Sequence, residues 1–343
     1  MCPARGGRAP IEVLIVSLAS THGLRIADEQ LAGALERAGA SVEIARALQP
    51  RPMRTLMLTD LSWAHAARKA AAEALRRCRP RAIIYSSTTA ALLWPQPGAI
   101  RFDAPSAGNR PGRHGLWQRP LERRRLAQAP LLLPWSEGAM RELSERPGSE
   151  ALVLPVAVEP SGPSTGERDI AAITYAANPS KKGLDRVLAA WRAVSGDGGL
   201  GAGELVVAGA SDDDLRKAGL AAGGAGVRSV GQLPREEYRA LLRRARVFVC
   251  APRREDYGIA QLEALADGCM LVTTPAPGPY AALPLARELD ARLVSLDLAG
   301  ALRVALEDPL AGYAARAAAL LEPFSRDAVE RVVAEELLPR LLA

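Results

Sequence analysis

Two glutamates eight residues apart stand where a predicted buried strand gives way to a helix. Residues 246–250 read Arg-Val-Phe-Val-Cys, an apolar run typical of a buried strand, and Glu255 falls in the loop beyond its carboxyl end. Gly258 is placed to open the helix, so Glu263 lies more than one turn inside it. One carboxylate can therefore reach a ligand from the loop while the other reaches it from the helix.

The start of the same predicted helix also suits an anion. The first N–H groups of a helix have no partner inside it, and the helix dipole places a partial positive charge there. The amides of Tyr257, Gly258 and Ile259 stand at this position and point toward the same crevice as the carboxylates. The sequence thus predicts a site for an anion such as a diphosphate.

The complete pattern is more specific than the glutamate pair. Residues 252–268 read Pro-x-x-Glu-x-Tyr-Gly-x4-Glu-Ala-x-Ala-x-Gly, and an apolar strand follows at 270–272. This pattern resembles the donor-site signature of glycosyltransferase family 4, whose members are retaining sugar-nucleotide transferases with the two-domain GT-B fold. Residue type, spacing and context agree, as a motif assignment requires. The alternative is that Glu255 is a solvated loop residue and Glu263 a surface position of an amphipathic helix.

A second stretch corresponds to the other half of such a donor site. In the family that the chain resembles, a basic pair after the first strand of the C-terminal domain neutralises the donor diphosphate, and Lys181-Lys182-Gly183 takes that place. An ammonium beside a glycine that admits a phosphate can stabilise a departing nucleotide. The alternative is a pair of solvated loop charges.

The resemblance implies a role for each matching residue. Glu255 would position the hydroxyls of the transferred sugar, Glu263 would hydrogen-bond the donor ribose, and Lys182 would stabilise the diphosphate as the glycosidic bond breaks. Glu255 and Lys182 are the expected catalytic residues. The expected donor-binding residues are Gly23, Lys181, Lys182, Arg253, Tyr257, Gly258, Ile259 and Glu263. The implied reaction is a front-face, retaining transfer that needs no metal and no cofactor besides the nucleotide-diphosphate sugar.

The chain also departs from the family pattern on the donor side. The usual arginine, about six residues before the lysine, falls at Ala176. One phosphate contact is then missing unless Arg253, Arg254 or Lys181 replaces it.

The acceptor side departs as well. The family often has a histidine in a His-Asp-like setting, and here Phe102 stands before Asp103 where that histidine would be. The acceptor-side candidates are Asp103, His22 and His114, although each histidine can also be an ordinary polar loop residue. Gly23 resembles the glycine of the loop after the first strand that approaches the donor phosphates, with a simple helix-start turn as the alternative.

Strand and helix patterns alternate along the chain, which predicts doubly wound sheets. A segment rich in Pro, Gly and Ser, 159–166, separates two such series. The expected strands are 11–18, 41–45, 82–85, 131–133, 152–154, 169–175, 205–208 and 247–250. The expected helices are 24–37, 63–77, one begun at 136, 184–194, 236–244 and 325–342.

The domain organisation follows from this alternation and from the length of 343 residues, which suits two domains of about 150 residues. We predict an N-terminal acceptor-side domain over 1–158, a linker over 159–168, a C-terminal donor domain over 169–322 and a final segment, 323–343, that crosses back to the first domain. The resemblance implies an α/β GT-B architecture, two Rossmann-like doubly wound domains facing a central cleft. Many other two-domain enzymes share the alternation itself.

The charge is unevenly distributed. The net charge is +6, yet residues 51–125 hold fifteen Lys or Arg against four acids, a balance of +11, so the rest of the chain carries −5. This favours an anionic partner such as a membrane surface or a phosphorylated acceptor, with a solvated arginine-rich surface as the alternative. Aromatic residues are only 4%, and no stacking platform interleaves the arginines, which argues against nucleic acid.

Other sequence features indicate the compartment and exclude several enzyme classes. No apolar run approaches the roughly 18 residues that span a bilayer, and 1–10 lacks the hydrophobic core of a signal peptide, so we expect a cytoplasmic protein, peripheral at the inner membrane face if the basic half meets lipid. The four cysteines form no Cys-x-x-Cys pair, which argues against structural zinc. Dinucleotide, P-loop and nucleophile-elbow motifs are missing from the sequence.

Taken together, these features predict a hexosyltransferase-type enzyme that moves a sugar from a nucleotide donor to an unidentified acceptor. Two alternatives share the donor site: a GT-B sugar-nucleotide epimerase or hydrolase, and a non-catalytic GT-B protein that binds a nucleotide sugar.

Overall fold

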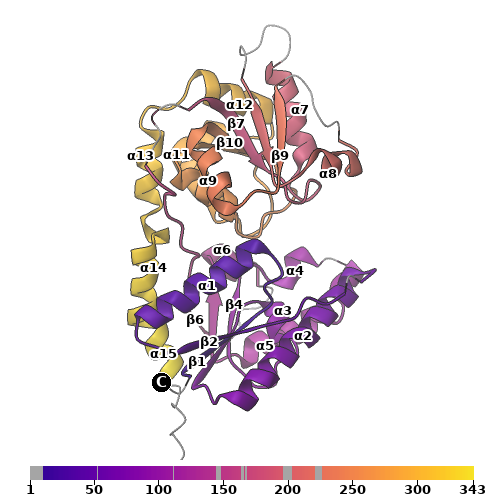
Figure 1. The fold of residues 1–343 in the computed structure, drawn as a ribbon, viewed down its shortest axis with the longest axis vertical. Helices are drawn as coiled ribbons and strands as arrows, with labels where there is room; N and C mark the ends of the chain where they lie inside the picture. Colours follow the sequence, from indigo (N-terminus) through magenta and orange to yellow (C-terminus); the bar gives the residue numbers. More distant parts are fainter. Residues whose placement is uncertain are drawn as a thin grey trace, which may run out of the picture. The chain divides into compact units, whose positions relative to one another are not determined.

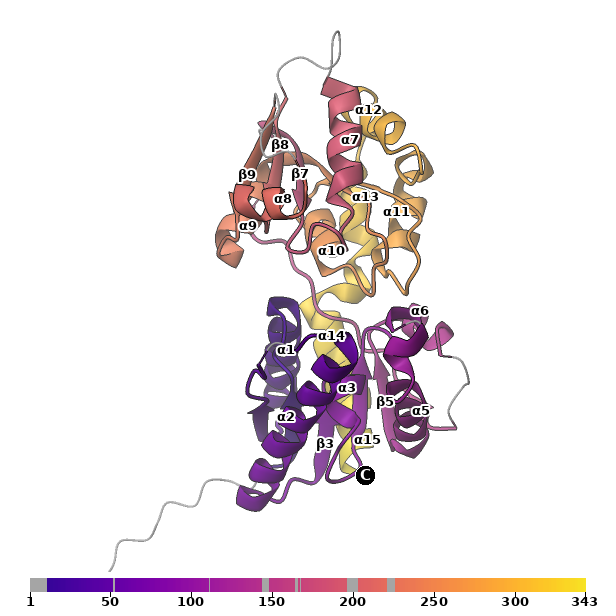
Figure 2. The same cartoon turned by 90° about the vertical axis from the view of Figure 1, so that its right-hand side faces the viewer.

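A computed structural model describes residues 11–343 except 52, 111, 144–147, 164–165, 167, 196–202 and 221–225. The chain divides into two compact units, Met1–Ala157 with Arg326–Ala343, and Val158–Ser325. Each unit is a parallel sheet with helices on both faces, as Figures 1 and 2 show. Among the described residues, no helix is both long and apolar enough to span a bilayer.

The first unit contains a six-stranded parallel sheet in the order β2-β1-β3-β4-β5-β6. Its strands are β1 (Val13–Ser17), β2 (Val42–Arg46), β3 (Ala82–Tyr85), β4 (Ala99–Phe102), β5 (Leu131–Pro134) and β6 (Glu150–Ala151). Its helices are α1 (His22–Arg37), α2 (Leu56–Arg77), α3 (Thr88–Ala91), α4 (Ser106–Asn109), the 3-10 helix η1 (Gly112–Gly115), α5 (Gln118–Gln128) and α6 (Glu137–Arg141).

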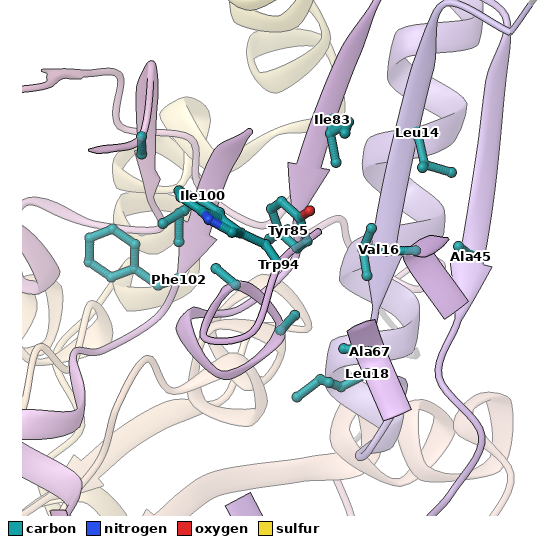
Figure 3. Close-up of a cluster of buried hydrophobic side chains, with 14 of the residues drawn as sticks. Leu14, Val16, Leu18, Ala45, Ala67, Ile83, Tyr85, Trp94, Ile100 and Phe102 are labelled. Atoms are coloured by element: carbon teal, nitrogen blue, oxygen red, sulfur yellow. The ribbon is translucent and has the colours of Figure 1, made fainter. Parts of the chain in front are cut away.

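Strands β1, β3 and β5 are mainly apolar on both faces because helices cover both. Side chains alternate along β1, so Leu14 and Val16 join one core and Val13 and Ile15 join the other. Figure 3 shows the first of these cores, where side chains from neighbouring strands meet Ala67 of α2. In each core, side chains of the central strands pack against helices. This packing fixes the positions of the loops that connect the strands to those helices.

The end of the chain belongs to the first unit. It forms one helical run composed of α14 (Arg326–Val332), the π-helical turn η4 (Val333–Leu337) and α15 (Leu338–Leu342). Val333 and Leu337 are fully buried in the core that α1 covers, and Glu330 lies 2.6 Å from Arg37 of α1. The unit boundaries fall after residues 157 and 325, close to the sequence-based limits of 158 and 322.

The second unit contains a five-stranded parallel sheet in the order β11-β10-β7-β8-β9. Its strands are β7 (Ile170–Tyr175), β8 (Leu205–Ala208), β9 (Val227–Gly231), β10 (Ala245–Cys250) and β11 (Met270–Thr273). Its helices are α7 (Leu184–Ser195), α8 (Asp212–Lys217), α9 (Arg235–Arg244), α10 (Ile259–Ala266), α11 (Ala282–Asp290), η2 (Ala291–Leu293), α12 (Leu298–Glu307), α13 (Tyr313–Leu320) and η3 (Glu322–Phe324). The described part of the expected linker packs on this unit, where the Ser161 amide donates to Asp267 at 2.8 Å.

Several elements differ from the sequence-based expectations. Helix α2 begins at Leu56 rather than at 63, because the Thr55 side chain accepts a hydrogen bond from the Leu58 amide and caps it. The strand expected at 152–154 is wrong: β6 covers only Glu150–Ala151, although the Leu152 amide still donates to the Leu132 carbonyl. Strands β4 and β9 and helices α5, α11, α12 and α13 were not foreseen.

A buried arginine explains why β4 escaped the apolar pattern. Arg101 is 2% exposed; its Nη1 donates to the Ala27 carbonyl at 3.1 Å and lies 3.6 Å from the Asp28 carboxylate. Its guanidinium also stacks over the Trp135 ring at 4.9 Å. Burial raises the pKa of Asp28, although Arg101 and hydrogen bonds from Ser17 and Ser86 oppose that rise. These partners make a buried charge acceptable in a central strand.

Candidate functional site

The loop after β10 brings the sequence-predicted residues of the second unit to the entrance of α10. Gly258 caps this helix with φ of 93°, a conformation that favours glycine, and a Cβ there would lie 3.1 Å from the Tyr280 ring. Within the part of the chain that the structure describes, the amides of Gly258 and Ile259 donate to no protein acceptor. They are therefore available to a ligand at the positive end of the helix.

Lys182 and Glu255 meet beside this helix end. Lys182 Nζ lies 2.6 Å from Glu255 Oε2, and Gln261 Nε2 donates to the same oxygen at 3.0 Å. Glu255 is only 5% exposed. Glu255 Oε1 accepts no hydrogen bond from any described residue, so one carboxylate oxygen is held by the protein and the other remains for a ligand.

Backbone contacts between two loops set this pair in place. The loop before α7 and the loop after β10 are neighbours because β7 and β10 pair in the sheet. The Arg253 amide donates to the Lys181 carbonyl at 3.0 Å. Gly183 has φ of 63°, and a Cβ on it would lie 1.9 Å from the Ala251 carbonyl oxygen. The glycine after Lys182 thus lets the two loops close on each other, and its expected approach to a phosphate stays a prediction.

A turn after β11 supports Glu255 from the other side. The Glu255 amide donates to the Pro277 carbonyl at 3.0 Å, and the Glu255 carbonyl accepts from the Tyr280 amide at 3.3 Å. A Cβ on Gly278 would lie 2.1 Å from that carbonyl oxygen. The side chains of Lys182 and Gln261 and the backbone of the turn after β11 therefore leave Glu255 little freedom to move, as a preorganised site requires.

Glu263 is held by two arginines of α9. Its Oε1 accepts from Arg235 Nη2 at 2.7 Å and from Arg239 Nη1 at 3.4 Å. Arg239 also donates to Asp267 at 2.6 Å and to the Glu159 carbonyl at 2.7 Å. Burial alone would lower the pKa of Arg239, but the hydrogen bond to Asp267 and the charge of Glu263 outweigh it and raise that pKa. Glu263 Oε2 accepts no hydrogen bond from the described residues.

The sequence analysis missed several residues of this cluster. Gln261 was not singled out, although its place six residues after Glu255 and two before Glu263 puts it on the same loop and helix. Arg235 and Arg239 lie one helical turn apart on α9, a spacing that would have indicated a shared cationic face. Local spacing along the sequence does not show which helices contact each other. Only the fold therefore shows which acids Arg235 and Arg239 bind.

The other basic residues expected near the donor are engaged by acids. Lys181 Nζ lies 3.0 Å from Asp256, and Arg254 Nε donates to the same carboxylate at 2.9 Å. Arg253 forms two hydrogen bonds of 3.0 Å with Asp185, and these bonds hold the pKa of Asp185 below its usual value. No described contact joins Arg253 to the Lys182 and Glu255 pair. Ala176, at the position of the family's arginine, is buried.

The acceptor-side candidates lie in the first unit, each on a different segment. His22 and Gly23 are the first two residues of α1, which Thr21 caps. Asp103 follows β4 and accepts from the Ala104 amide at 2.8 Å, and His114 is exposed in η1. Phe102 is 1% exposed and belongs to the core shown in Figure 3, so it is not placed like a ligand-facing histidine.

The acids of the described residues are arranged for hydrogen bonding rather than for metal coordination. No group of three or more His, Cys, Asp or Glu side chains in that part of the chain could hold a metal ion. The acidic run Asp212 to Asp214 lies in the first turn of α8, where Ser211 and Asp214 form a reciprocal cap. The expectation that the reaction needs no metal stays a prediction.

Comparison with known proteins indicates which fold this geometry belongs to. Residues 168–311 match the family model of Glycosyl transferases group 1. No curated protein matches the chain. Sucrose-phosphate synthase from Thermosynechococcus elongatus has a TM-score of 0.65 at 17% identity, over 97% of this chain and 99% of that one. An α,α-trehalose-phosphate synthase (UDP-forming) from Burkholderia xenovorans, in complex with glucose-6-phosphate, has a TM-score of 0.68 at 14% identity, over 98% and 100%.

A third solved structure is WaaG, a glycosyltransferase involved in lipopolysaccharide biosynthesis, with a TM-score of 0.60 at 14% identity, over 91% of this chain and 100% of that one. These likenesses establish the fold: the two sheets, of six and five parallel strands, are the Rossmann-like domains of a GT-B architecture. The resemblance drawn from residues 252–268 and the expected fold class are thereby confirmed.

Proposed function

We propose that this chain, which carries a glycosyltransferase group 1 domain within a GT-B fold, is a retaining hexosyltransferase that uses a nucleotide-diphosphate sugar. The second unit would bind the donor, and the first unit would bind the acceptor. The contact that carries the proposal is the 2.6 Å pair between Lys182 Nζ and Glu255 Oε2 beside the open amides of α10. The name of the trehalose-phosphate synthase, UDP-forming, supports a nucleotide donor.

Different residues of the cluster would bind different parts of the donor. The diphosphate would accept hydrogen bonds from the Gly258 and Ile259 amides and lie against the Lys182 ammonium, where the helix dipole adds to the positive field. Glu255 Oε1 would accept a hydrogen bond from a hydroxyl of the transferred sugar. Glu263 Oε2 would accept a hydrogen bond from a ribose hydroxyl. Each oxygen assigned to the donor is one that no described protein donor uses.

This arrangement favours transfer without a protein base. The bond between C1 of the sugar and the diphosphate oxygen breaks, and its electron pair leaves with the diphosphate, which Lys182 and the helix end stabilise. The acceptor hydroxyl forms the new bond on the same face and passes its proton to the departing phosphate oxygen. Glu255 would position the sugar rather than act as base or nucleophile, because hydrogen bonds from Lys182 and Gln261 already occupy its Oε2.

One observation favours a second function, the non-catalytic binding of a nucleotide sugar. Ala176 has no side chain that can bind a phosphate, and the three candidates to replace the missing arginine, Lys181, Arg253 and Arg254, are each paired with an acid. A weaker positive field at the diphosphate would still permit binding while slowing the departure of the nucleotide. An epimerase or hydrolase would share this donor site and differ in its product.

The test is turnover with a panel of UDP, GDP and ADP sugars and candidate acceptors, followed by nucleotide release and product mass. We expect nucleotide release that depends on an acceptor and is lost in Lys182→Ala and Glu255→Ala. Lys217→Ala, an exposed lysine of α8, is the matched control and should retain full activity. Tight donor binding without turnover under any acceptor would support the binding protein instead.

A further inference from the structure

The loop between β2 and α2 and the first turn of α2 expose an unusual amount of apolar surface. Leu48 is 77% exposed and Leu56 is 52% exposed, and Met53, Met57 and Leu58 are each at least 36% exposed. A helix of a soluble domain normally turns its apolar stripe toward the core, yet all three apolar residues that open α2 are exposed. Single exposed apolar residues are common, but a contiguous group marks an interaction surface.

A second element extends this surface. Leu116, which follows η1, is 61% exposed. The 3-10 helix η1 contacts α2, and Arg110 binds Asp60 of α2 through two hydrogen bonds of 2.6 and 3.0 Å. The residue groups 48–58 and 113–116 therefore belong to one region of the first unit. We refer to the exposed side chains of Leu48, Met53, Leu56, Met57, Leu58 and Leu116 as the apolar rim.

The charges around the apolar rim are positive. Arg51, Arg54 and Arg113 are exposed, and none of them pairs with a carboxylate in the part of the chain that the structure describes. The sequence contains no acid in 47–59 or in 104–121, and Asp60 is neutralised by Arg110. A surface that combines exposed apolar side chains with unpaired arginines matches the boundary between acyl chains and anionic headgroups.

The rim also lies at the edge of the sheet where such folds bind their ligands. The 48–58 loop follows the carboxyl end of β2, and the segment with η1 follows that of β4. In doubly wound sheets, ligands bind outside the carboxyl ends of the strands. An acceptor bound to this unit would therefore arrive on the same side as the rim.

We propose that the apolar rim docks the first unit on an anionic lipid bilayer. The leucines and methionines enter the headgroup region, while Arg51, Arg54 and Arg113 bind lipid phosphates. A second copy of the chain is a poorer occupant, because a symmetric contact would bring the same unpaired arginines of both copies together. If the proposed transferase function also holds, its acceptor is a membrane-presented molecule; the docking surface itself does not rest on that function.

Cosedimentation with vesicles tests the docking without donor or acceptor. The full chain should bind vesicles of equal parts phosphatidylglycerol and phosphatidylcholine more strongly than vesicles of phosphatidylcholine alone. Leu48→Ser with Leu56→Ser should weaken binding by about tenfold or more, because two apolar side chains no longer enter the bilayer. Arg51→Gln with Arg54→Gln should weaken it by about fivefold for each arginine removed, and less at high salt.

Matched changes in the second unit serve as controls. Leu296→Ser removes a leucine that is 83% exposed, the most exposed one among the described residues of that unit, and Arg192→Gln with Arg287→Gln removes two exposed arginines. These controls should bind like the unaltered chain, and thermal unfolding should be similar for all variants. Equal binding to both vesicle types, or loss in the controls as large as in the rim variants, would overturn the proposal.

A sedimentation-velocity measurement distinguishes lipid docking from self-association of the chain through the apolar rim. If the rim mediates self-association, the unaltered chain forms a dimer that Leu48→Ser with Leu56→Ser abolishes, and the lipid proposal is then wrong. Because vesicle binding is measured without substrates, its failure would leave the proposed transfer reaction untouched, and failure of the reaction would leave vesicle binding untouched.

Discussion

The carbonyl oxygen of Ala251 occupies the space where a side chain on Gly183 would begin, 1.9 Å from the position of its Cβ. This contact presses the loop before α7 against the loop after β10. Lys182 and Glu255 stand on these two loops, 2.6 Å apart. The spacing of this ion pair is therefore set by a backbone contact that neither charged residue makes.

Gly183→Ala should consequently impair both stability and donor turnover. The φ of 63° costs an alanine about 1 kcal/mol or more, and the collision with Ala251 must also move the loop. Gly219, with φ of 71° and open space around its Cβ position, is the matched control: Gly219→Ala should bear only the conformational cost. Urea unfolding and nucleotide release measure the two effects. Equal losses in both variants would show that the contact with Ala251 has no separate role.

The pair of Lys182 and Glu255 should show coupling in a double-mutant cycle. Lys182→Met leaves a nearly buried carboxylate with Gln261 as its remaining described partner, so it should lower the free energy of unfolding by up to about 3 kcal/mol. Adding Glu255→Gln removes the uncompensated charge and should restore much of that stability. Nucleotide release should stay low in all three variants. Additive stability losses would contradict a direct interaction in solution.

The two arginines that hold Glu263 should have separable effects. Arg239 is 3% exposed and binds Asp267 as well as Glu263, so Arg239→Ala should destabilise the protein by about 3 kcal/mol or more. The side chain of Arg235 is 40% exposed, so Arg235→Ala should leave unfolding nearly unchanged and instead raise KM for the donor by loosening Glu263. A change in kcat alone for Arg235→Ala would argue against a role of Glu263 in donor binding.

The cysteines of the second unit should be unreactive in the folded protein. Burial raises the pKa of Cys269 to about 12 and also raises that of Cys250, so both are neutral thiols at pH 8. We expect a thiol reagent to modify half-buried Cys78 first, and these two only on unfolding; Cys2 lies outside the described residues and would be replaced by serine. Rapid labelling of all three without denaturant would contradict the buried placement.

The same shift predicts how stability depends on alkaline pH. The folded pKa of Cys269 lies above the ordinary value of 9.0, so the folded state holds its proton more tightly. Its contribution to stability is complete below pH 9 and is lost as the pH rises from 9 toward 12, at up to about 1.4 kcal/mol per pH unit. Cys269→Ala should flatten this part of the unfolding profile relative to the unaltered chain.

The sequence was most informative where a motif lies within one strand, loop and helix. The run from β10 to α10 placed Glu255, Gly258 and Glu263 correctly relative to each other because local spacing determines their positions. The partners of these residues come from elsewhere: Lys182 lies 73 residues from Glu255 and Arg239 lies 24 from Glu263. Such contacts depend on sheet order and helix packing, which periodicity does not reveal.

The elements of the first unit were harder to predict from the sequence, because tertiary contacts there override local patterns. Arg101 breaks the apolar run of β4 but is acceptable because Asp28 and Trp135 surround it. The start of α2 was placed too late because its first turn is apolar and exposed, so it lacks the amphipathic signal of a buried helix. Neither β4 nor the start of α2 could be predicted from local sequence patterns.

The return of residues 326–343 to the first unit makes the second unit an insertion within the first. During translation the ribosome releases Val158–Ser325 before it releases Val333 and Leu337, which complete the core beneath α1. The second unit can thus fold as a self-contained body before the segment that completes the first unit is synthesised. A chain that lacks residues 326–343 would therefore present a finished insert on an unfinished host.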